Sequence, residues 1–293
     1  MATIRPAEES DLAAAYDAFY QTEVLGDPNP PPPGSAAELW HVFRTGRVYV
    51  AEIDGTIAGF GAAIARGNHD YLTDLFVQPG LQSGGLGRLL LDHTLPPAEG
   101  RVRSTISSSD HRAHALYIRH GLRPRWPHYN LAIRGAQPAS WPEAGVEMRE
   151  TSPDDADLLL WDARVSGRER PMDLEFWARE QRAVPFWFER GGRRVGYGLV
   201  RLSAGTLSHP DSCEVGPVGV ERADDAVACV LAAARWAAGH AARVMVNLPG
   251  PHPALAPLLE LGFRITYVET FHTEAEAPYF DERRYIASGS TLL

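Results

Sequence analysis

An internal repeat constrains the fold of this chain more than any other feature of its sequence. Within the 293 residues, three landmarks occur twice in the same order: an extended segment leading into a helical run, a strand–turn–strand pattern, and an aliphatic helix ending at a glycine. Such self-similarity is the signature of a duplicated structural unit. The sequence therefore predicts two copies of one domain. The matched positions are Ile4 and Met148, Gly59 and Gly196, and Gly121 and Gly262, at offsets of 144, 137 and 141 residues.

Residues 134–145 separate the two copies. This stretch contains prolines, glycines and small residues without a hydrophobic period, as is typical of a linker. We therefore expect an N-terminal domain of residues 1–137 and a C-terminal domain of residues 138–293. Both fall within the usual size range of a domain, about 50–250 residues.

The composition is that of a globular protein, with 44% hydrophobic and 22% charged residues. A net charge of −9 disfavours binding to nucleic acid, because the phosphate backbone would be repelled. The longest basic cluster, Arg190 with Arg193–Arg194, is interrupted by glycines and is typical of an exposed turn. Cys213 and Cys229 form no Cys-x-x-Cys pair and have no histidine at metal-ligand spacing, so we expect neither a metal site nor a disulfide scaffold.

The first residues of the chain lack the basic and apolar regions of a signal peptide. No segment approaches 18 consecutive apolar residues, the length that would suggest a membrane-spanning helix. We therefore expect a cytoplasmic protein without a membrane partner.

A glycine-rich segment lies between a predicted strand and a predicted helix. The strand covers residues 71–77, a turn follows, and the loop Gln82–Arg88 leads into the aliphatic run Leu89–Leu91. This order presents backbone N–H groups and a helix N-terminus to an anion, and the glycines allow a phosphate to approach the main chain. The segment favours a pyrophosphate site, and the alternative interpretation is an ordinary strand-to-helix connection.

The spacing of the loop residues separates it from other phosphate-binding loops. Gln82-x-x-Gly85-x-Gly87 is neither the Gly-x-Gly-x-x-Gly of dinucleotide-binding proteins nor the Gly-Lys-Ser/Thr of P-loops. It resembles the Gln/Arg-x-x-Gly-x-Gly/Ala motif of the GNAT superfamily of acetyl-CoA-dependent N-acyltransferases. Downstream, residues 110–122 resemble the family's Asn-x-x-Ala-x-x-Leu-Tyr-x-x-x-Gly-Phe segment. The resemblance extends over the first copy to about Ile133.

This resemblance implies an α/β fold of two tandem GNAT-like domains, each with a mixed central β-sheet flanked by α-helices. It also implies acetyl-CoA as the acyl donor, and no metal. In the family, the main chain of the strand before the loop binds the pantetheine arm, and the loop binds the pyrophosphate mostly through backbone N–H groups. The residues thus implied in coenzyme binding are Leu75, Phe76, Val77, Gln82, Ser83, Gly84, Gly85, Leu86, Gly87 and Arg88.

Asp110 is a departure from the family pattern, which often has asparagine at this position. A carboxylate could still accept a hydrogen bond from a pantetheine N–H, but it could not donate one when ionised. We keep Asp110 as an expected coenzyme contact.

Transfer of an acyl group to an amine requires a base for the ammonium proton and an acid for the leaving thiolate. Tyr117 matches the family's tyrosine that donates to the coenzyme A sulfur, and the alternative is an aromatic residue that packs on the inner face of its helix. For the base we favour Asp74, which period-two alternation places on the same strand face as Leu72 and Phe76. Burial there would raise its pKa, although a purely structural carboxylate is an equal alternative. The rival candidates for the base are His69, Asp70 and His111.

The second copy differs from the first in both motifs. Its strand Cys213–Val220 is followed by Glu221–Asp225, whose three carboxylates would repel a pyrophosphate. Its aligned helix contains Leu258 and Leu259 but no tyrosine. We therefore expect the second copy to bind no acyl-CoA, and to support the first copy or to shape its acceptor pocket.

The sequence thus predicts an N-acetyltransferase in which the amine of a small molecule attacks acetyl-CoA directly, with the N-terminal domain active. An acidic protein favours a cationic amine. The alternative is a non-catalytic acyl-CoA-binding regulatory or protein-interaction protein. The sequence leaves open the identity of the amine, the length of the acyl chain and the oligomeric state.

Overall fold

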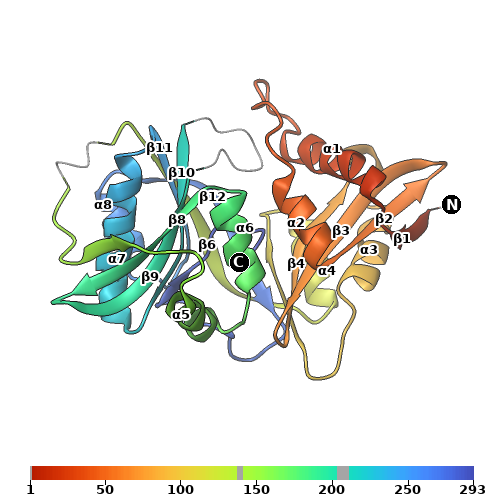
Figure 1. The fold of residues 1–293 in the computed structure, drawn as a ribbon. Helices are drawn as coiled ribbons and strands as arrows, with labels where there is room; N and C mark the ends of the chain where they lie inside the picture. Colours follow the sequence, from red (N-terminus) through yellow and green to blue (C-terminus); the bar gives the residue numbers. More distant parts are fainter. Residues whose placement is uncertain (1, 137–140, 203–210) are drawn as a thin grey trace.

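The computed structural model describes residues 2–136, 141–202 and 211–293. Its two halves lie side by side, and the C-terminus lies between them (Figure 1). The order of elements in the first half, β-α-α-β-β-β-α-β-α-β, is repeated in the second, which confirms the predicted tandem α/β architecture. The first half contains β1 (Thr3–Pro6), α1 (Leu12–Glu23), α2 (Ala37–Thr45), β2 (Arg47–Ile53), β3 (Thr56–Arg66), β4 (His69–Val77), α3 (Leu86–Thr94), β5 (Val102–Ser107), α4 (His111–Arg119) and β6 (Arg123–Arg134), with short 3-10 turns at Glu9–Asp11 and Pro79–Leu81. The second half contains β7 (Glu147–Glu150), α5 (Ala156–Ser166), α6 (Pro171–Arg179), β8 (Ala183–Arg190), β9 (Arg193–Arg201), β10 (Ser212–Val220), α7 (Ala223–Ala238), β11 (Arg243–Pro249), α8 (Leu255–Glu260) and β12 (Arg264–Thr273), followed by a short strand β13 (Tyr285–Ile286).

The two halves exchange their last strands. β12, from the second half, lies between β5 and β6 and pairs antiparallel with both. β6, from the first half, pairs on its other side with β11 of the second half. The described strands therefore form one continuous sheet in the order β1-β2-β3-β4-β5-β12-β6-β11-β10-β9-β8-β7, with β13 attached to β10.

This exchange bears on the predicted division at residues 137 and 138, which falls within residues 137–140, outside the described part of the chain. By sequence β6 belongs to the first domain, but both of its neighbours in the sheet come from the second. The division remains a prediction about the chain, and each half depends on a strand from the other to complete its sheet.

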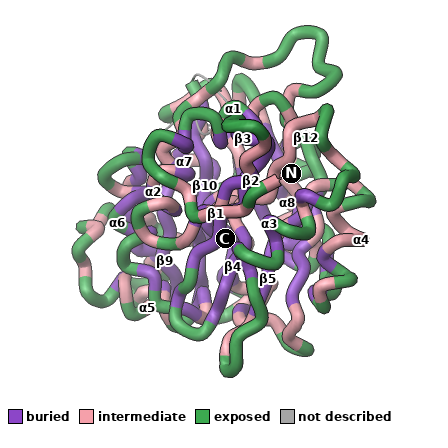
Figure 2. The backbone as a smooth tube through the Cα atoms, turned by 90° about the vertical axis from the view of Figure 1, so that its right-hand side faces the viewer, coloured by how far each residue is buried: buried purple, intermediate pink, exposed green. Residues whose placement is uncertain are grey.

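Helices cover both faces of the first half of the sheet. Val50 and Phe60 pack with α1 and α2 on one face, whereas Ala51 and Ala58 pack with α3 on the other. The successive residues Val50 and Ala51 face opposite sides because a strand has a period of two. Ala58 and Phe60 are two residues apart and also face opposite sides, because Ala58 is an extra residue on β3, at a bulge opposite Ala51 and Glu52. Figure 2 shows the buried residues concentrated along the strands and the exposed residues along the peripheral loops. No helix in the described residues is long and apolar enough to cross a membrane.

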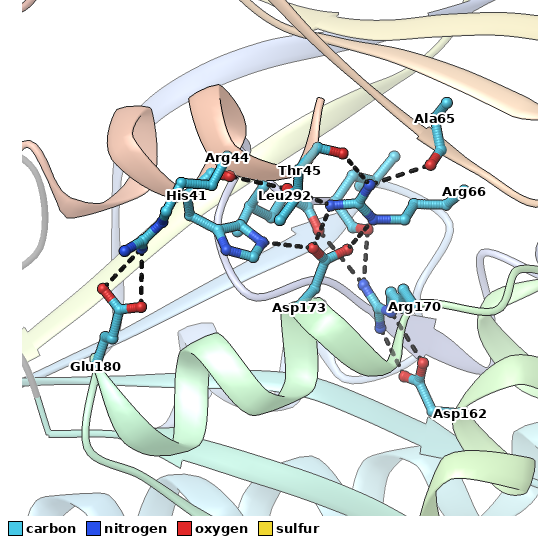
Figure 3. A network of polar contacts seen from close by, with 11 residues as sticks. His41, Arg44, Thr45, Ala65, Arg66, Asp162, Arg170, Asp173, Glu180 and Leu292 are labelled. Carbon is cyan, nitrogen blue, oxygen red and sulfur yellow. Dashed lines mark hydrogen bonds and ion pairs between the residues drawn. The ribbon is translucent and has the colours of Figure 1, made fainter. Parts of the chain in front are cut away.

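A buried polar cluster joins α2 and β3 of the first half to α6 of the second (Figure 3). Asp173 on α6 is fully buried. Its carboxylate lies 2.7 Å from His41 Nε2 and accepts two hydrogen bonds from Arg66, at 2.6 and 2.8 Å. A second, exposed ion pair joins the same two helices, with Arg44 Nη2 at 2.9 Å from Glu180 at the end of α6. The two pairs allow a buried and an exposed contact across one interface to be compared.

We expect Asp173→Ala to lower the free energy of unfolding by about 3–5 kcal/mol, because it leaves the Arg66 guanidinium buried without its anion. Glu180→Ala, the matched control, should cost no more than about 1 kcal/mol, because the pair it breaks is exposed. Urea denaturation of both variants at pH 7 measures the two losses. A small loss for both would show that the buried cluster does not hold the halves together.

The contribution of Asp173 to stability depends on pH. Burial alone would raise the pKa of Asp173, but hydrogen bonds from Arg66 and His41 outweigh it and lower the pKa to about 2. Because the pKa in the folded state lies below the ordinary value, this stabilisation is present above about pH 4 and is lost as the pH falls toward 2. The difference in stability between wild type and Asp173→Ala should shrink over that interval.

Candidate active site

The sheet opens between β4 and β5. The two strands pair in parallel only from His69 to Leu72, opposite Val102 to Thr105. Beyond Leu72, β4 continues to Val77 paired with β3 alone. The edge of β4 that faces β5 therefore has no strand partner there, and its backbone groups can bind an extended ligand.

A β-bulge at Thr73 sets which way the side chains of β4 point. Asp74 is opposite Ala62 of β3, but Leu72 is opposite Ala63, so Thr73 is an extra residue on this strand. Asp74 and Phe76 consequently face α1, whereas Leu72 packs on the α3 side. The expectation that Asp74 shares a face with Phe76 holds, and the expectation that it shares one with Leu72 is wrong. Strict alternation fails because a bulge re-aims the side chains that follow it.

The glycine loop leads directly into α3. Gly85 adopts a left-handed conformation with φ of 88° immediately before Leu86, the first residue of the helix. Ser83 is also left-handed, with φ of 65°. No side chain caps the N-terminus of α3. The first N–H groups of the helix are therefore available to an anion.

A pocket of about 790 Å³ lies between this loop, the open edge of β4 and α4. It contains most of the side chains and glycines predicted to contact the coenzyme. Phe76, Gly84 and Leu86 do not line it: the Phe76 ring packs against Phe19 and Phe60, and the Leu86 side chain is buried in the core. The predicted residues that line the pocket are Leu75, Val77, Gln82, Ser83, Gly85, Gly87, Arg88, Asp110 and Tyr117.

Two of these side chains have partners within the protein. Gln82 Nε2 donates to the carbonyl of Val77 at 3.1 Å, so the Gln82 side chain fastens the loop to the end of β4. Asp110 caps α4 by accepting from Arg112 N at 2.8 Å, and it forms an ion pair with the Arg112 guanidinium at 2.6 Å. The hydrogen bond and charge of Arg112 lower the pKa of Asp110. The carboxylate at this position is therefore compensated locally.

Tyr117 lies where two cavities meet. It is 5% exposed, and its ring contacts the edge of His272 of β12, with ring centroids 5.7 Å apart. Together with Leu75 and Ala113 it lines both the pocket beside the loop and a second cavity of about 410 Å³ on the other side of β4. Burial raises the pKa of Tyr117 above its ordinary value, and Asp74 adds to the shift. The phenol therefore keeps its proton at neutral pH and can donate it.

Asp74 lines the second cavity. Its carboxylate accepts a hydrogen bond from Thr73 Oγ1 at 2.7 Å. Burial raises its pKa to about 7, with smaller contributions from the negative charges of Glu38 and Glu23. A carboxylate with such a pKa is a stronger base than an exposed one and is still largely ionised slightly above neutrality.

The rival bases are placed less favourably. Asp70 is held by Arg47 at 3.0 Å and by Arg101 at 2.6 Å, as expected for a structural carboxylate. His69 packs on Tyr279, and burial lowers its pKa to about 4. Neither lines either cavity. His111 is exposed at the rim of the pocket beside the loop.

The second cavity includes side chains that sequence reasoning did not single out. Arg201, Glu214, Asn247 and Glu269 come from the second half, and Asn130 comes from the exchanged strand β6. No local motif marks these residues, because the exchange of β6 and β12 brings them beside Asp74. The sequence carried only the general expectation that the second copy supports the first copy or shapes its acceptor pocket.

In the second half, the position equivalent to the gap between β4 and β5 is filled. β10 and β11 pair in parallel from Ser212 to Val215, opposite Arg243 to Val246. Beyond that point β13 pairs with Val218 and Gly219 of β10. The chain is so close here that a Cβ at Gly216 would lie 2.0 Å from the carbonyl oxygen of Ala287.

Comparison with known proteins finds a family match within the first half of the chain. Residues 44–124, which include the loop and Tyr117, match the family model described as acetyltransferase (GNAT) domain. No curated protein matches the sequence.

Three solved structures share the fold over nearly the whole chain. A putative acetyltransferase from Pyrococcus horikoshii superimposes with a TM-score of 0.77 at 14% identity, covering 99% of this chain and 95% of that one. A tandem GNAT protein from the clavulanic acid biosynthesis pathway has a TM-score of 0.67 at 16% identity, covering 95% and 99%. A GCN5-related N-acetyltransferase from Sphaerobacter thermophilus has a TM-score of 0.62 at 19% identity, covering 99% and 98%. Residues 44–124 thus match a GNAT acetyltransferase domain, and the chain as a whole shares the fold of these solved structures, one of which is a tandem GNAT protein.

Proposed function

We propose that this protein transfers an acetyl group from acetyl-CoA to a primary amine of a small molecule, with the N-terminal domain as the active one. The observation that carries the proposal is the junction of two cavities at Leu75, Ala113 and Tyr117. One cavity has the glycine loop and the open edge of β4, features suited to an extended, phosphate-bearing donor. The other has Asp74 and other carboxylates, features suited to an amine.

The proposed reaction assigns one proton transfer to each of two side chains. Asp74, ionised, takes a proton from the acceptor ammonium, and the neutral amine attacks the thioester carbonyl. The C–S bond then breaks, and Tyr117 donates its proton to the departing thiolate. The nitrogen loses its second proton as the amide forms, and this proton restores the Tyr117 phenol. The amine ends as an amide and the coenzyme as a thiol, and the proton taken up by Asp74 is the one released overall.

The proposed coenzyme contacts divide by type. Leu75, Phe76 and Val77 would bind the pantetheine through their main chain, a role that leaves the Phe76 ring free to pack against Phe19 in the core. Ser83, Gly84, Gly85, Leu86, Gly87 and Arg88 would bind the pyrophosphate through backbone N–H groups, with Gln82 shaping the loop and Asp110 at the rim.

The proposal that the second domain binds no acyl-CoA rests on two observations. β13 pairs with β10 where the first half has an open edge. α7 begins with Asp224 and Asp225 in its first turn, where the first half has the glycine loop. One acetyl-CoA per chain is therefore expected.

Isothermal titration should detect one acetyl-CoA per chain for wild type, and no binding for Gly85→Glu. The substitution strains a residue at φ of 88° and adds a negative charge beside the pyrophosphate. Gly191→Glu is the matched control, because Gly191 is also left-handed, with φ of 58°, and also has open space around its Cβ position. Two molecules per chain, or equal losses in both variants, would contradict the placement of the site.

Asp74→Asn should lower kcat by about 100- to 10,000-fold while acetyl-CoA affinity stays within about twofold, because only proton transfer is removed. Since the base acts in its ionised form, kcat of wild type should rise with pH through about 7. The variant should lose this dependence. Asp17→Asn, an exposed substitution on α1, is the control. An unchanged pH profile in Asp74→Asn would assign the base to another group.

Tyr117→Phe should also lower kcat, because it deletes the proton donor for the thiolate and keeps the ring that packs in the pocket. An acyl donor whose leaving group is more acidic than coenzyme A should reduce the defect, because its thiolate needs less protonation. A defect of equal size with both donors would point to a structural role for Tyr117.

Binding of acetyl-CoA without turnover of any amine would favour the alternative function, a non-catalytic acyl-CoA-binding regulatory protein.

A further inference from the structure

The cavity beside Asp74 has more negative than positive side chains. The described residues that line it include five carboxylates and two guanidinium groups. Arg201 is already engaged on both sides, by Glu38 at 2.8 Å and by a short contact with Glu214. The second guanidinium, Arg243, interacts with Glu214 and is opposed by Arg134.

Three of the five carboxylates remain without a cationic partner among the described residues. They are Glu23 at the end of α1, Asp74 on β4 and Glu269 on β12. They are electrostatically coupled, because the charge of Glu23 raises the pKa of both Asp74 and Glu269. Glu23 is exposed to solvent, so the buried surplus is that of Asp74 and Glu269. Such a surplus is relieved by protonation or by a cation that enters the cavity.

Glu269 is the most buried of the three. It is 9% exposed and it lines the cavity. Its hydrogen-bond donors are neutral: Asn130 Nδ2 lies at 2.7 Å, and Ser290 contributes a second bond. Burial raises its pKa to about 7, and the negative charges of Glu23 and Glu214 add to the shift. Neutral donors orient a carboxylate without neutralising its charge.

The position of Glu269 relative to the reacting group follows from the sheet. Glu269 pairs with His128 of β6, and its neighbour Thr270 pairs with Ser107 at the end of β5, which also lines the cavity. Asp74 lies on β4, across the gap between β4 and β5. An amine that reaches the thioester beside Asp74 and Tyr117 therefore has its remaining part in a space that includes Glu269.

We propose that Glu269 binds a second positive charge on the acceptor, so that the acceptor is a small dicationic amine such as an aliphatic diamine. This inference rests on the proposed function, because it takes the cavity beside Asp74 as the acceptor site. The volume of about 410 Å³ is near the lower end of the range for small-molecule sites, which suits a compact acceptor. One ammonium group loses its proton and is acetylated, and the other stays charged at Glu269.

Binding measurements with matched ligands test whether the site binds a second positive charge on the acceptor, without any acetyl transfer. Protein saturated with coenzyme A, which has no acyl group to transfer, is titrated calorimetrically with 1,4-diaminobutane, butylamine and 4-aminobutanoate. We expect the diamine to bind about 10- to 100-fold more tightly than butylamine, as for one charge-assisted contact in a buried site. The amino acid should bind most weakly, because its carboxylate would face Glu269.

Glu269→Gln should bring the ratio of diamine to butylamine affinity close to one, because glutamine keeps an oxygen for Asn130 but removes the charge. Glu260→Gln, an exposed substitution on α8, should leave the ratio as in wild type. Equal affinities for the two amines in wild type, no binding of the diamine, or a ratio that survives Glu269→Gln would each overturn the inference.

Acetylation assays with the same amines separate this inference from the proposed function. Turnover of butylamine and diamine at equal efficiency would keep the acetyltransferase and overturn the role of Glu269. Diamine binding through Glu269 without turnover of any amine would support the cation site and contradict the transferase.

Discussion

The pairing of β12 with β5 and β6 is the contact on which the rest of this structure depends. It inserts a strand of the second half beside the first half's β5, and it joins all the described strands of the main path into one sheet. Backbone hydrogen bonds along β12 therefore fix the distance between the two halves. The buried carboxylate of Asp173, held by Arg66 and His41, reinforces the same interface from the helical side.

Duplication has led to different structures at equivalent positions. In the first half, the gap between β4 and β5 opens onto a glycine loop whose helix N-terminus is uncapped by any side chain. In the second half, β13 pairs at the corresponding place on β10. One copy keeps an open edge that can receive a ligand, and the other contributes side chains to the cavity next to it. We infer that the second copy has become part of the acceptor site.

Burial separates the proposed roles of the acidic groups near this junction. Tyr117 and Asp74 both have pKa values raised mainly by burial, but the consequences differ. The tyrosine, whose ordinary pKa is already high, is kept as a proton donor. Burial raises the pKa of Asp74 to about 7, so this carboxylate can act as a base near neutrality. Asp70 is also buried on the same strand, but it forms ion pairs with Arg47 and Arg101. Its role is therefore structural.

The sequence by itself determined the repeat, the order of elements, the glycine loop and the helix of Tyr117, because each depends on local pattern: alternation in strands, glycine at left-handed positions such as Gly85, and the spacing of two motifs. It did not reveal the bulge at Thr73, since an extra residue in a strand leaves no periodic trace, and so it placed Leu72 on the wrong face. Only the tertiary structure decided that β6 and β12 change places and that Glu269 and Asp74 line one cavity. The physical reason is that a strand's hydrophobic pattern specifies which face it buries, whereas its neighbour in the sheet is chosen by backbone hydrogen bonds that any strand of suitable length can form.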